Sequence, residues 1–183
     1  VLGGFAGGSG YIMVRNSDWF LAIWDKCFKF LGKPQTIQLP RIGSFADLVA
    51  PCLLLGMAIG RIGDVINGEH FARFTTLPWG VVYTHPDSPA INRPASHPAV
   101  AYELIFDLII VVVLWFAKDK LRPDGMVFAL ALSLYALGRF FISFLRIEAN
   151  TYFGLNEAQI VCLAILIVTV PLLVYKASLV RRS

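Results

Sequence analysis

The chain has 183 residues, of which 57% are hydrophobic and only 15% charged, and its formal net charge is +4. A soluble domain averages roughly 25% charged residues and leaves much of its surface in water, so this composition excludes disorder, fibrous repeats and an ordinary cytosolic enzyme. The positive charge does not indicate a nucleic-acid partner, because the basic residues lie in short clusters between apolar runs. We expect an integral membrane protein with a single domain over residues 1–183.

The amino-terminal segment gives a weaker hydrophobic signal than the rest. It covers residues 1–14 and continues after Arg15 into the aromatic run 19–24, which favours either an interfacial helix or a truncated membrane span. It contains no recognisable signal peptide and no initiator Met, which leaves open whether residues precede Val1.

Four later segments are apolar over about 20 residues, the length of helix that crosses a bilayer core. Because lipid offers no hydrogen-bond partner for an open strand edge, each segment is expected to be a helix. The predicted fold is therefore all-α and polytopic, with four clear transmembrane helices over residues 45–66, 98–117, 125–145 and 158–175.

The basic clusters orient these spans. All three clusters fall on one side if the four spans alternate, and that side is cytoplasmic by the positive-inside rule. Their members are Lys26, Lys29, Lys33 and Arg41, then Lys118, Lys120 and Arg122, then Lys176, Arg181 and Arg182. The sequence thus predicts a cytoplasmic loop over residues 25–42, a cytoplasmic carboxyl terminus and an extracytoplasmic loop over residues 67–97. That outer loop is longer than a connector needs, so we expect the chemistry on its side.

Ionisable residues at the end of the first span are functional candidates, because charge is costly in lipid. The candidates and the small or polar residues among them are Arg61, Asp64, Asn67, Gly68 and Glu69. A helix-packing face over residues 56–60, with Arg61 reaching to the interface, explains the glycines but not the whole string.

The third span carries Arg139, Ser143 and Arg146 at helical spacing, so one face presents two guanidinium groups near the outer surface. Guanidinium forks match phosphate oxygens and keep their charge, which suits an anionic lipid head group. Anchoring to bulk lipid phosphates explains Arg146 well. It explains Arg139, about two turns deeper, less well.

The second span opens with a proline after His97, a pattern typical of a helix start, and a histidine there is more often structural than catalytic. Glu103 and Asp107 follow, one turn apart on one face. Two carboxylates in an apolar helix need cationic partners, and Arg61 and Arg139 are available; alternatively one carboxylate is protonated.

The three cysteines, Cys27, Cys52 and Cys162, lie far apart in the sequence and form no metal-ligand or C-x-x-C spacing. We expect buried thiols. The sequence predicts neither a metal site nor a cofactor.

Three strings of the sequence together resemble the prolipoprotein diacylglyceryl transferase family. G-R-I-G-D-V-I-N-G-E-H-F is similar to the family's G-R-x-G-N-F-x-N-G-E signature, and L-P-W-G-V-V-Y followed by H-P-A-V-A-Y-E to its central loop and H-P-x-x-x-Y-E motif. G-R-F-F-I-S-F-L-R is similar to the family's R-x-x-x-E-x-x-R helix. The order and spacing also agree, over roughly residues 45–175.

The resemblance implies an enzyme of the bacterial plasma (inner) membrane that moves the diacylglyceryl group of phosphatidylglycerol to the lipobox cysteine thiol of a preprotein, releasing glycerol phosphate. Arg61 and Arg139 would stabilise the developing negative charge, and Glu69 or His97 would take the thiol proton. Phosphatidylglycerol or another anionic phospholipid would contact Arg61, Asp64, Asn67, Gly68, Tyr102, Arg139 and Arg146.

The departures from the family pattern suggest an alternative. Asp64 replaces an asparagine and repels phosphate unless Arg61 pairs with it, Ala72 replaces a glycine, and Ser143 replaces the carboxylate of the late motif, so that its ion pair is lost. The family's Gly-Gly helix has no secure equivalent near residues 3–8. The alternative is a catalytically inactive homologue that serves as a lipid-binding subunit of a larger membrane protein complex. A small transporter is a remoter possibility, because the charges cluster near the outer face rather than at the midplane.

Overall fold

The structure, a computed structural model, describes residues 7, 10, 11, 13–28, 41–68, 71–148, 150–152 and 154–179. The chain divides into two compact units, Val1–Arg41 and Ile42–Ser183.

The amino-terminal unit contains helix α2, Asp18–Cys27. Phe20, Trp24 and Phe28 lie four residues apart on one face, and their ring centroids are 5.9 and 5.1 Å apart in succession. A helix of 10 residues is half the length that crosses a bilayer core, so α2 alone does not span one.

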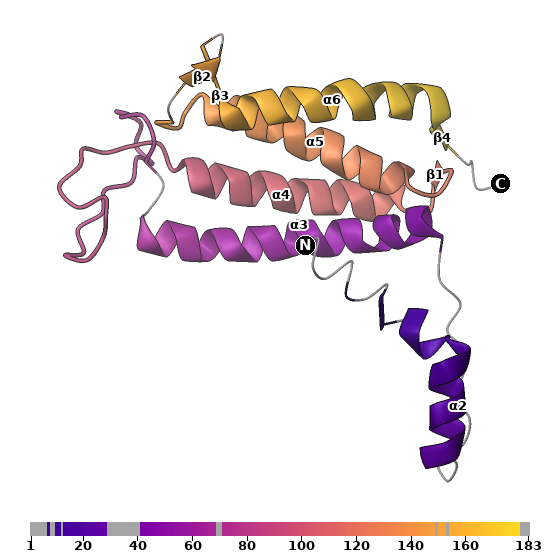
Figure 1. Ribbon diagram of the computed structural model, residues 1–183. Coiled ribbons are helices and arrows are strands. Elements are labelled where there is room, and N and C mark those ends of the chain that lie inside the picture. Colours follow the sequence, from indigo (N-terminus) through magenta and orange to yellow (C-terminus); the bar gives the residue numbers. More distant parts are fainter. Residues whose placement is uncertain are drawn as a thin grey trace. The chain divides into compact units, whose positions relative to one another are not determined.

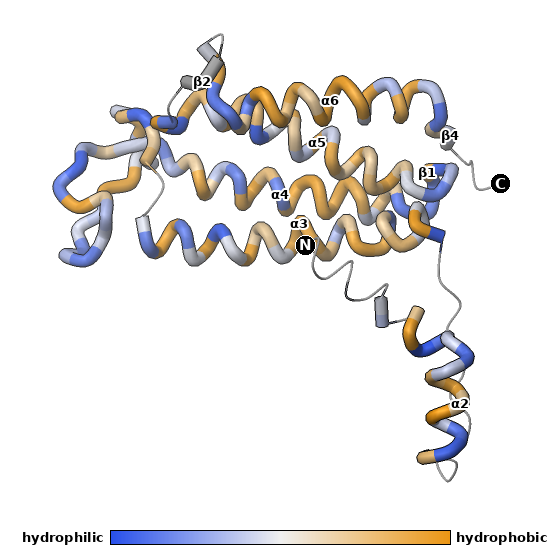
Figure 2. The backbone as a smooth tube through the Cα atoms, viewed as in Figure 1, coloured by the Kyte–Doolittle hydropathy of each residue, from blue (hydrophilic) through white to orange (hydrophobic). Residues whose placement is uncertain are grey.

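The second unit is a bundle of four helices, each long and apolar enough to cross a membrane. They are α3 (Ile42–Asn67), α4 (Ala99–Ala117), α5 (Met126–Ser143) and α6 (Glu157–Lys176). The helices lie side by side, with α4 against α3 and α5 against both α4 and α6 (Figure 1). The predicted all-α polytopic fold and its four spans are therefore confirmed, with ends that differ by a few residues. Apolar residues make up most of each of these helices, and hydrophilic residues gather in the connections (Figure 2).

Two short strand pairs, which the sequence did not predict, join the helix ends. β1 (Leu121–Arg122) pairs antiparallel with β4 (Ser178–Leu179), and β2 (Asn150–Tyr152) pairs antiparallel with β3 (Leu155–Asn156). These pairs tie the chain near the end of α6 to the connection between α4 and α5, and the start of α6 to the segment that follows α5.

A carboxylate on α3 fixes the start of α5. Asp47 accepts hydrogen bonds from the backbone N–H groups of Gly125, at 2.7 Å, and Phe128, at 2.8 Å. These donors have no partner within their own helix, because the first turn of any helix leaves its N–H groups unpaired. Ser44 adds a second link, since its hydroxyl donates to the Asp124 carboxylate at 2.5 Å. The two helices are thereby held in register at this end.

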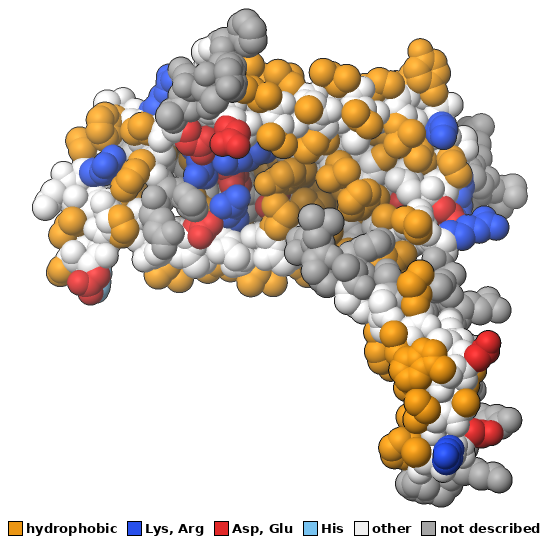
Figure 3. Space-filling model, viewed as in Figure 1, with side chains coloured by type: hydrophobic (Ala, Val, Ile, Leu, Met, Phe, Trp, Pro, Cys, Tyr) orange, Lys and Arg blue, Asp and Glu red, His pale blue; other side chains and the backbone are white. Residues whose placement is uncertain are grey.

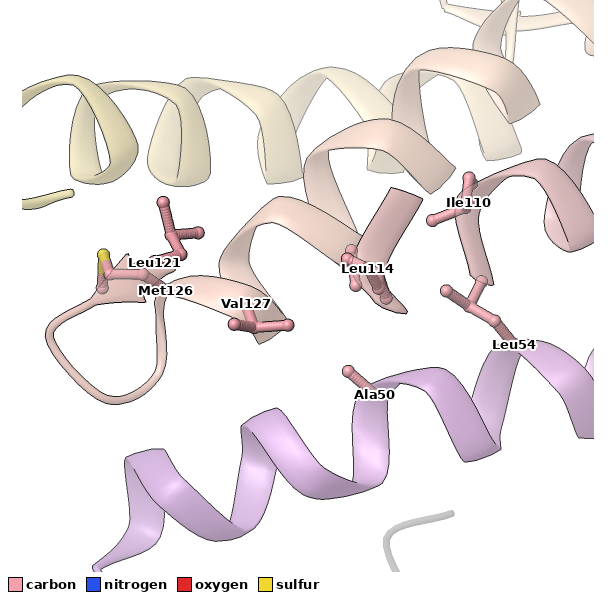
Figure 4. Packing of buried hydrophobic residues seen from close by; sticks show 8 residues of the cluster. Ala50, Leu54, Ile110, Leu114, Leu121, Met126 and Val127 are labelled. Atoms are coloured by element: carbon pink, nitrogen blue, oxygen red, sulfur yellow. The ribbon is translucent and has the colours of Figure 1, made fainter. Parts of the chain in front are cut away.

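The hydrophobic core lies toward the same end of the bundle (Figure 4). Leu54 on α3 and Ile110 and Leu114 on α4 pack with residues of the α4–α5 connection and the start of α5. The buried members of this cluster are Ala50, Leu54, Ile110, Leu114, Leu121, Met126, Val127 and Ala131. The apolar core thus occupies the end where α4 finishes, and the opposite end, where α4 begins, holds the charged side chains.

The prediction of buried thiols is confirmed for Cys162 and wrong for the other two cysteines, since Cys27 and Cys52 are exposed. Cys52 lies on α3, whose outward side chains are largely apolar, so a weakly polar thiol is tolerated there without burial in protein. The general tendency of cysteine to be buried applies to chains surrounded by water.

The connection between α3 and α4 is tied by backbone hydrogen bonds to the segment that follows α5. The N–H of Arg73 donates to the carbonyl of Leu145 at 2.8 Å, and the N–H of Ile147 donates to the carbonyl of Phe71 at 3.1 Å. The N–H of His97 donates in turn to the Arg73 carbonyl at 3.0 Å. Three parts of the chain that are distant in sequence therefore meet where α3 ends, α4 begins and α5 ends.

Candidate functional site

A single buried carboxylate organises the charged end of the bundle. Glu103, in the first turns of α4, is only 3% exposed. Its Oε2 atom lies 2.6 Å from Nη2 of Arg61 on α3. Its Oε1 atom accepts hydrogen bonds from Arg139 on α5 and, at 3.3 Å, from Nη1 of Arg146. The expectation that Arg61 and Arg139 pair with a carboxylate of the second span is confirmed for Glu103.

A second carboxylate, Glu148, closes a ring of ion pairs. Its Oε1 atom accepts from Nε of Arg146 at 2.7 Å and from Nη2 of Arg139 at 3.3 Å. Glu103 and Glu148 thus bridge the same two guanidinium groups from different sides. Glu148 was not among the residues predicted for the site, although an acidic residue two positions after Arg146, in a short connection between two spans, was a usable signal.

The side chain of Arg146 is turned into this ring and is only 8% exposed. Anchoring to bulk lipid phosphates therefore does not account for it. Arg139 lies on α5, which ends at Ser143, and Arg146 lies in the segment that follows; both reach Glu103.

Asp64 forms a second ion pair with Arg61, in addition to the one between Arg61 and Glu103. Its Oδ2 atom accepts from Nη1 of Arg61 at 2.8 Å, across one turn of α3. The sequence analysis expected Asp64 to repel phosphate unless Arg61 paired with it, and the pair is present.

Among the described residues, the ion pairs of this cluster join three arginines to three carboxylates, those of Asp64, Glu103 and Glu148. These ion pairs orient the donors of the site. A guanidinium group has five N–H donors, and the ion pairs of Arg139 with Glu103 and Glu148 use two of them. An anionic ligand would meet N–H groups that are already held in place.

Asp107 does not join the cluster. It lies one turn after Glu103 and is 2% exposed, and its Oδ2 atom has no hydrogen-bond partner among the described residues. The expectation of an arginine partner is thus confirmed for Glu103 alone of the two carboxylates on α4. In the part of the chain that is described, no group of three or more His, Cys, Asp or Glu residues is arranged to hold a metal ion.

Two cavities adjoin the arginines. One of about 420 Å³ lies beside Arg139 and Glu148, with apolar walls from Val161 and Ile165 on α6. The other, of about 230 Å³, is lined by Met57, Gly60, Arg61 and Asp64 on α3. Basic and acidic side chains gather at this end of the bundle beside a continuous hydrophobic stretch (Figure 3). Arg139 and Arg61 thus each have a polar contact on one side and open space on another, an arrangement that suits an amphipathic anion.

His97 and Tyr102 form a separate group. Nε1 of Trp79 donates to the Tyr102 hydroxyl at 2.8 Å, and the same hydroxyl lies 3.5 Å from Nδ1 of His97. Among the described residues, the side-chain hydrogen bonds of His97 and Tyr102 join these three residues and do not include the arginines. The sequence analysis expected Tyr102 to contact lipid, and Trp79 is the partner that it did not identify.

Asn67 is the last residue of α3, and Gly68 begins the outer connection. Gly68 has φ +73°, and a Cβ atom there would lie 2.7 Å from the Ser88 hydroxyl and 2.8 Å from the ring of Tyr83. Only glycine fits this turn without strain. The Ser88 hydroxyl donates to the Asn67 carbonyl at 3.2 Å. Glu69, the other candidate base, lies outside the described residues.

Comparison with known proteins identifies the family. A family model described as prolipoprotein diacylglyceryl transferase matches residues 33–175. The chain belongs to this family. A phosphatidylglycerol–prolipoprotein diacylglyceryl transferase of Dehalococcoides mccartyi is 40% identical over 135 residues, which cover 74% of this chain and 52% of that protein.

Two further relatives agree. The transferase of Polynucleobacter asymbioticus is 37% identical over 144 residues, covering 75% of this chain and 50% of its own. The second transferase of Streptomyces coelicolor is 40% identical over 124 residues, covering 66% and 38%. The chain spans about half the length, or less, of these curated relatives. Its four membrane-crossing helices and its bacterial family make it a bacterial membrane protein.

The structure shows which contacts are made at the positions where this chain departs from the motifs of the diacylglyceryl transferase family. Ser143 is buried and its hydroxyl has no hydrogen-bond partner among the described residues. An ion pair from position 143 is thus absent, as expected, but Arg139 and Arg146 both pair with Glu148. Ala72 is buried and forms an isolated backbone bridge with Arg146, so its methyl group is accommodated. The sought Gly-Gly helix falls on residues 3–8, nearly all of which lie outside the described residues.

Proposed function

We propose that this protein transfers the diacylglyceryl group of phosphatidylglycerol to the lipobox cysteine of a prolipoprotein. The observation that carries the proposal is the cluster of arginines around Glu103. Arg139 in this cluster presents oriented N–H donors beside a cavity of about 420 Å³ with apolar walls. The printed names of the relatives state this activity and these two substrates for those proteins.

The reaction forms a carbon–sulfur bond and breaks a carbon–oxygen bond. The thiolate of the prolipoprotein attacks the glyceryl carbon that bears the phosphate ester, and glycerol phosphate leaves with the bonding electrons. Negative charge develops on the departing phosphate oxygen. Arg139 and Arg61 meet that charge with N–H donors fixed by Glu103, Glu148 and Asp64, so little reorganisation is needed as the bond breaks.

The thiol must lose its proton to become a nucleophile, and Glu69 or His97 is the proposed base. Nδ1 of His97 faces the Tyr102 hydroxyl, so Nε2 is the atom that would take the proton. Phosphatidylglycerol, or another anionic phospholipid, would lie with its phosphate at the arginines and its acyl chains against apolar side chains such as Val161 and Ile165.

We further propose that residues 67–97 face the extracytoplasmic side of the plasma (inner) membrane and that the carboxyl terminus is cytoplasmic. The basic clusters support this orientation through the positive-inside rule. An inactive subunit of a larger membrane complex is less well supported, because Asp64 is paired with Arg61 and Glu148 supplies a carboxylate to Arg146, which offsets two of the departures on which that hypothesis rested.

The test is a transfer assay. The full chain in lipid nanodiscs containing phosphatidylglycerol is incubated with a lipobox peptide, and the thioether product is measured by mass spectrometry. Arg139→Ala should lower kcat/KM by about 100-fold or more, the usual effect of removing one transition-state contact. Arg122→Ala is the matched control, because Arg122 lies at the other end of the bundle, pairs with Asp124 and has a side chain that is 55% exposed. Absence of product from the folded, lipid-replete chain would contradict the proposal.

A further inference from the structure

Glu148 forms ion pairs with both Arg139 and Arg146, although the family motif places its carboxylate elsewhere. The late family motif, R-x-x-x-E-x-x-R, carries its carboxylate at the position of Ser143, on α5 between the two arginines. In this chain the Ser143 hydroxyl is 2% exposed and its Oγ atom has no hydrogen-bond partner among the described residues. Glu148 lies beyond the end of α5 and contacts both arginines.

The backbone around Glu148 explains how it reaches them. The segment just before it is held against the outer connection, since the N–H of Ile147 donates to the Phe71 carbonyl and the Leu145 carbonyl accepts from Arg73. Arg146 itself forms a backbone bridge with Ala72. These contacts fix the turn after α5, so that the Glu148 carboxylate meets Nε of Arg146 and Nη2 of Arg139.

We propose that Glu148 is a positioning residue that replaces the motif's carboxylate at position 143 and holds Arg139 and Arg146 for the substrate's phosphate. This inference rests on the proposed transferase function. Without Glu148, the two guanidinium groups would still reach the Oε1 atom of Glu103, but they would lose the second carboxylate that bridges them and opposes their mutual repulsion. Arg139 would then rotate out of the geometry that the leaving phosphate needs.

The experiment removes the carboxylate at position 148 and then introduces one at position 143. Glu148→Gln keeps the shape of the side chain but removes its charge, and should lower kcat for diacylglyceryl transfer by about 10- to 100-fold, with a smaller change in KM for phosphatidylglycerol. Glu148→Gln combined with Ser143→Glu restores a carboxylate between the two arginines and should recover most of the lost kcat. Asp87→Asn is the control, because Asp87 is an exposed carboxylate of the outer connection with a side chain that is 92% exposed.

A readout that does not depend on turnover separates this inference from the proposed function. Phenylglyoxal modifies guanidinium groups, and ion-paired arginines react slowly. In Glu148→Gln, modification of Arg139 and Arg146 should become several-fold faster than in the parent chain, with Arg122 as the internal reference in each sample. The double variant should return both rates toward the parent values. If the parent chain shows no transfer, the proposed function fails while this measurement still tests the role of Glu148.

Unchanged kcat and unchanged modification rates in Glu148→Gln would overturn the inference. So would a folded double variant that recovers neither quantity. If Ser143→Glu prevents folding, Glu148→Asp takes its place, because it keeps the charge on a side chain shorter by one methylene. Glu148→Asp should retain more kcat than Glu148→Gln, and equal losses in the two variants would contradict a role for the charge.

Discussion

Glu103→Gln is the substitution that should disturb the charged end of the bundle most. It preserves the size of the side chain but removes the negative charge to which three arginines are bound. Breaking a buried ion pair by removing one partner costs about 3–5 kcal/mol, because it leaves an uncompensated charge. Arg61 keeps Asp64, and Arg139 and Arg146 keep Glu148, so each guanidinium group retains one carboxylate. We therefore expect a loss near the lower end of that range, about 3 kcal/mol.

Unfolding in mixed micelles of dodecylmaltoside and increasing dodecyl sulfate, followed by circular dichroism, gives the free energy of unfolding for the full chain. Asp119→Asn is the matched control, since Asp119 is an exposed carboxylate near the opposite end of the bundle and the same acid-to-amide change there should alter stability by less than about 0.5 kcal/mol. If Glu103→Gln lowers the free energy of unfolding by less than about 1 kcal/mol, a loss indistinguishable from that of the control, the role of Glu103 as the common partner of the three arginines is refuted.

Three further predictions concern the frame around the site. Asp47→Ala leaves two N–H groups at the start of α5 without their acceptor and should lower the free energy of unfolding by about 2 kcal/mol in the same assay, whereas an effect below about 0.5 kcal/mol would contradict the link between α3 and α5. Gly68→Ala places a Cβ atom against Ser88 and Tyr83 at φ +73° and should cost about 1–3 kcal/mol; full stability would show that this turn differs in solution. Burial raises the pKa of Tyr83, so its phenol should ionise at higher pH than free tyrosine in an ultraviolet titration. Its contribution to stability is present below the unfolded pKa of about 10 and is lost as pH rises through the folded value, and ionisation at or below the ordinary value would contradict burial of this phenol.

The membrane spans could be predicted because long apolar runs have few alternatives in lipid. The pairing of Glu103 with Arg61 and Arg139 could be predicted for the same reason, since charges within spans need partners. The resemblance of three motifs to one family gave the family correctly, and the family comparison confirms it.

Glu148 could not be found by the same logic, because it lies outside every span and because the motif assigns the carboxylate to position 143. Its contact depends on backbone pairing between the turn after α5 and the segment around residue 72, which are more than 70 residues apart in sequence. The link from Asp47 to the start of α5 was missed for a similar reason, as a helix cap supplied by another helix leaves no local pattern. Cys52 was misjudged because an outward-facing position on a lipid-exposed helix is also apolar.

The central claim is that the arginines around Glu103 bind the phosphate of an anionic lipid. An experimental density map of the full chain in nanodiscs containing phosphatidylglycerol tests it most directly. We predict a phosphate within hydrogen-bond distance of Arg139, with acyl chains along α6 near Val161 and Ile165. Ordered phospholipid found only at the opposite end of the bundle, near Arg122, with no phosphate at Arg61 or Arg139, would contradict it.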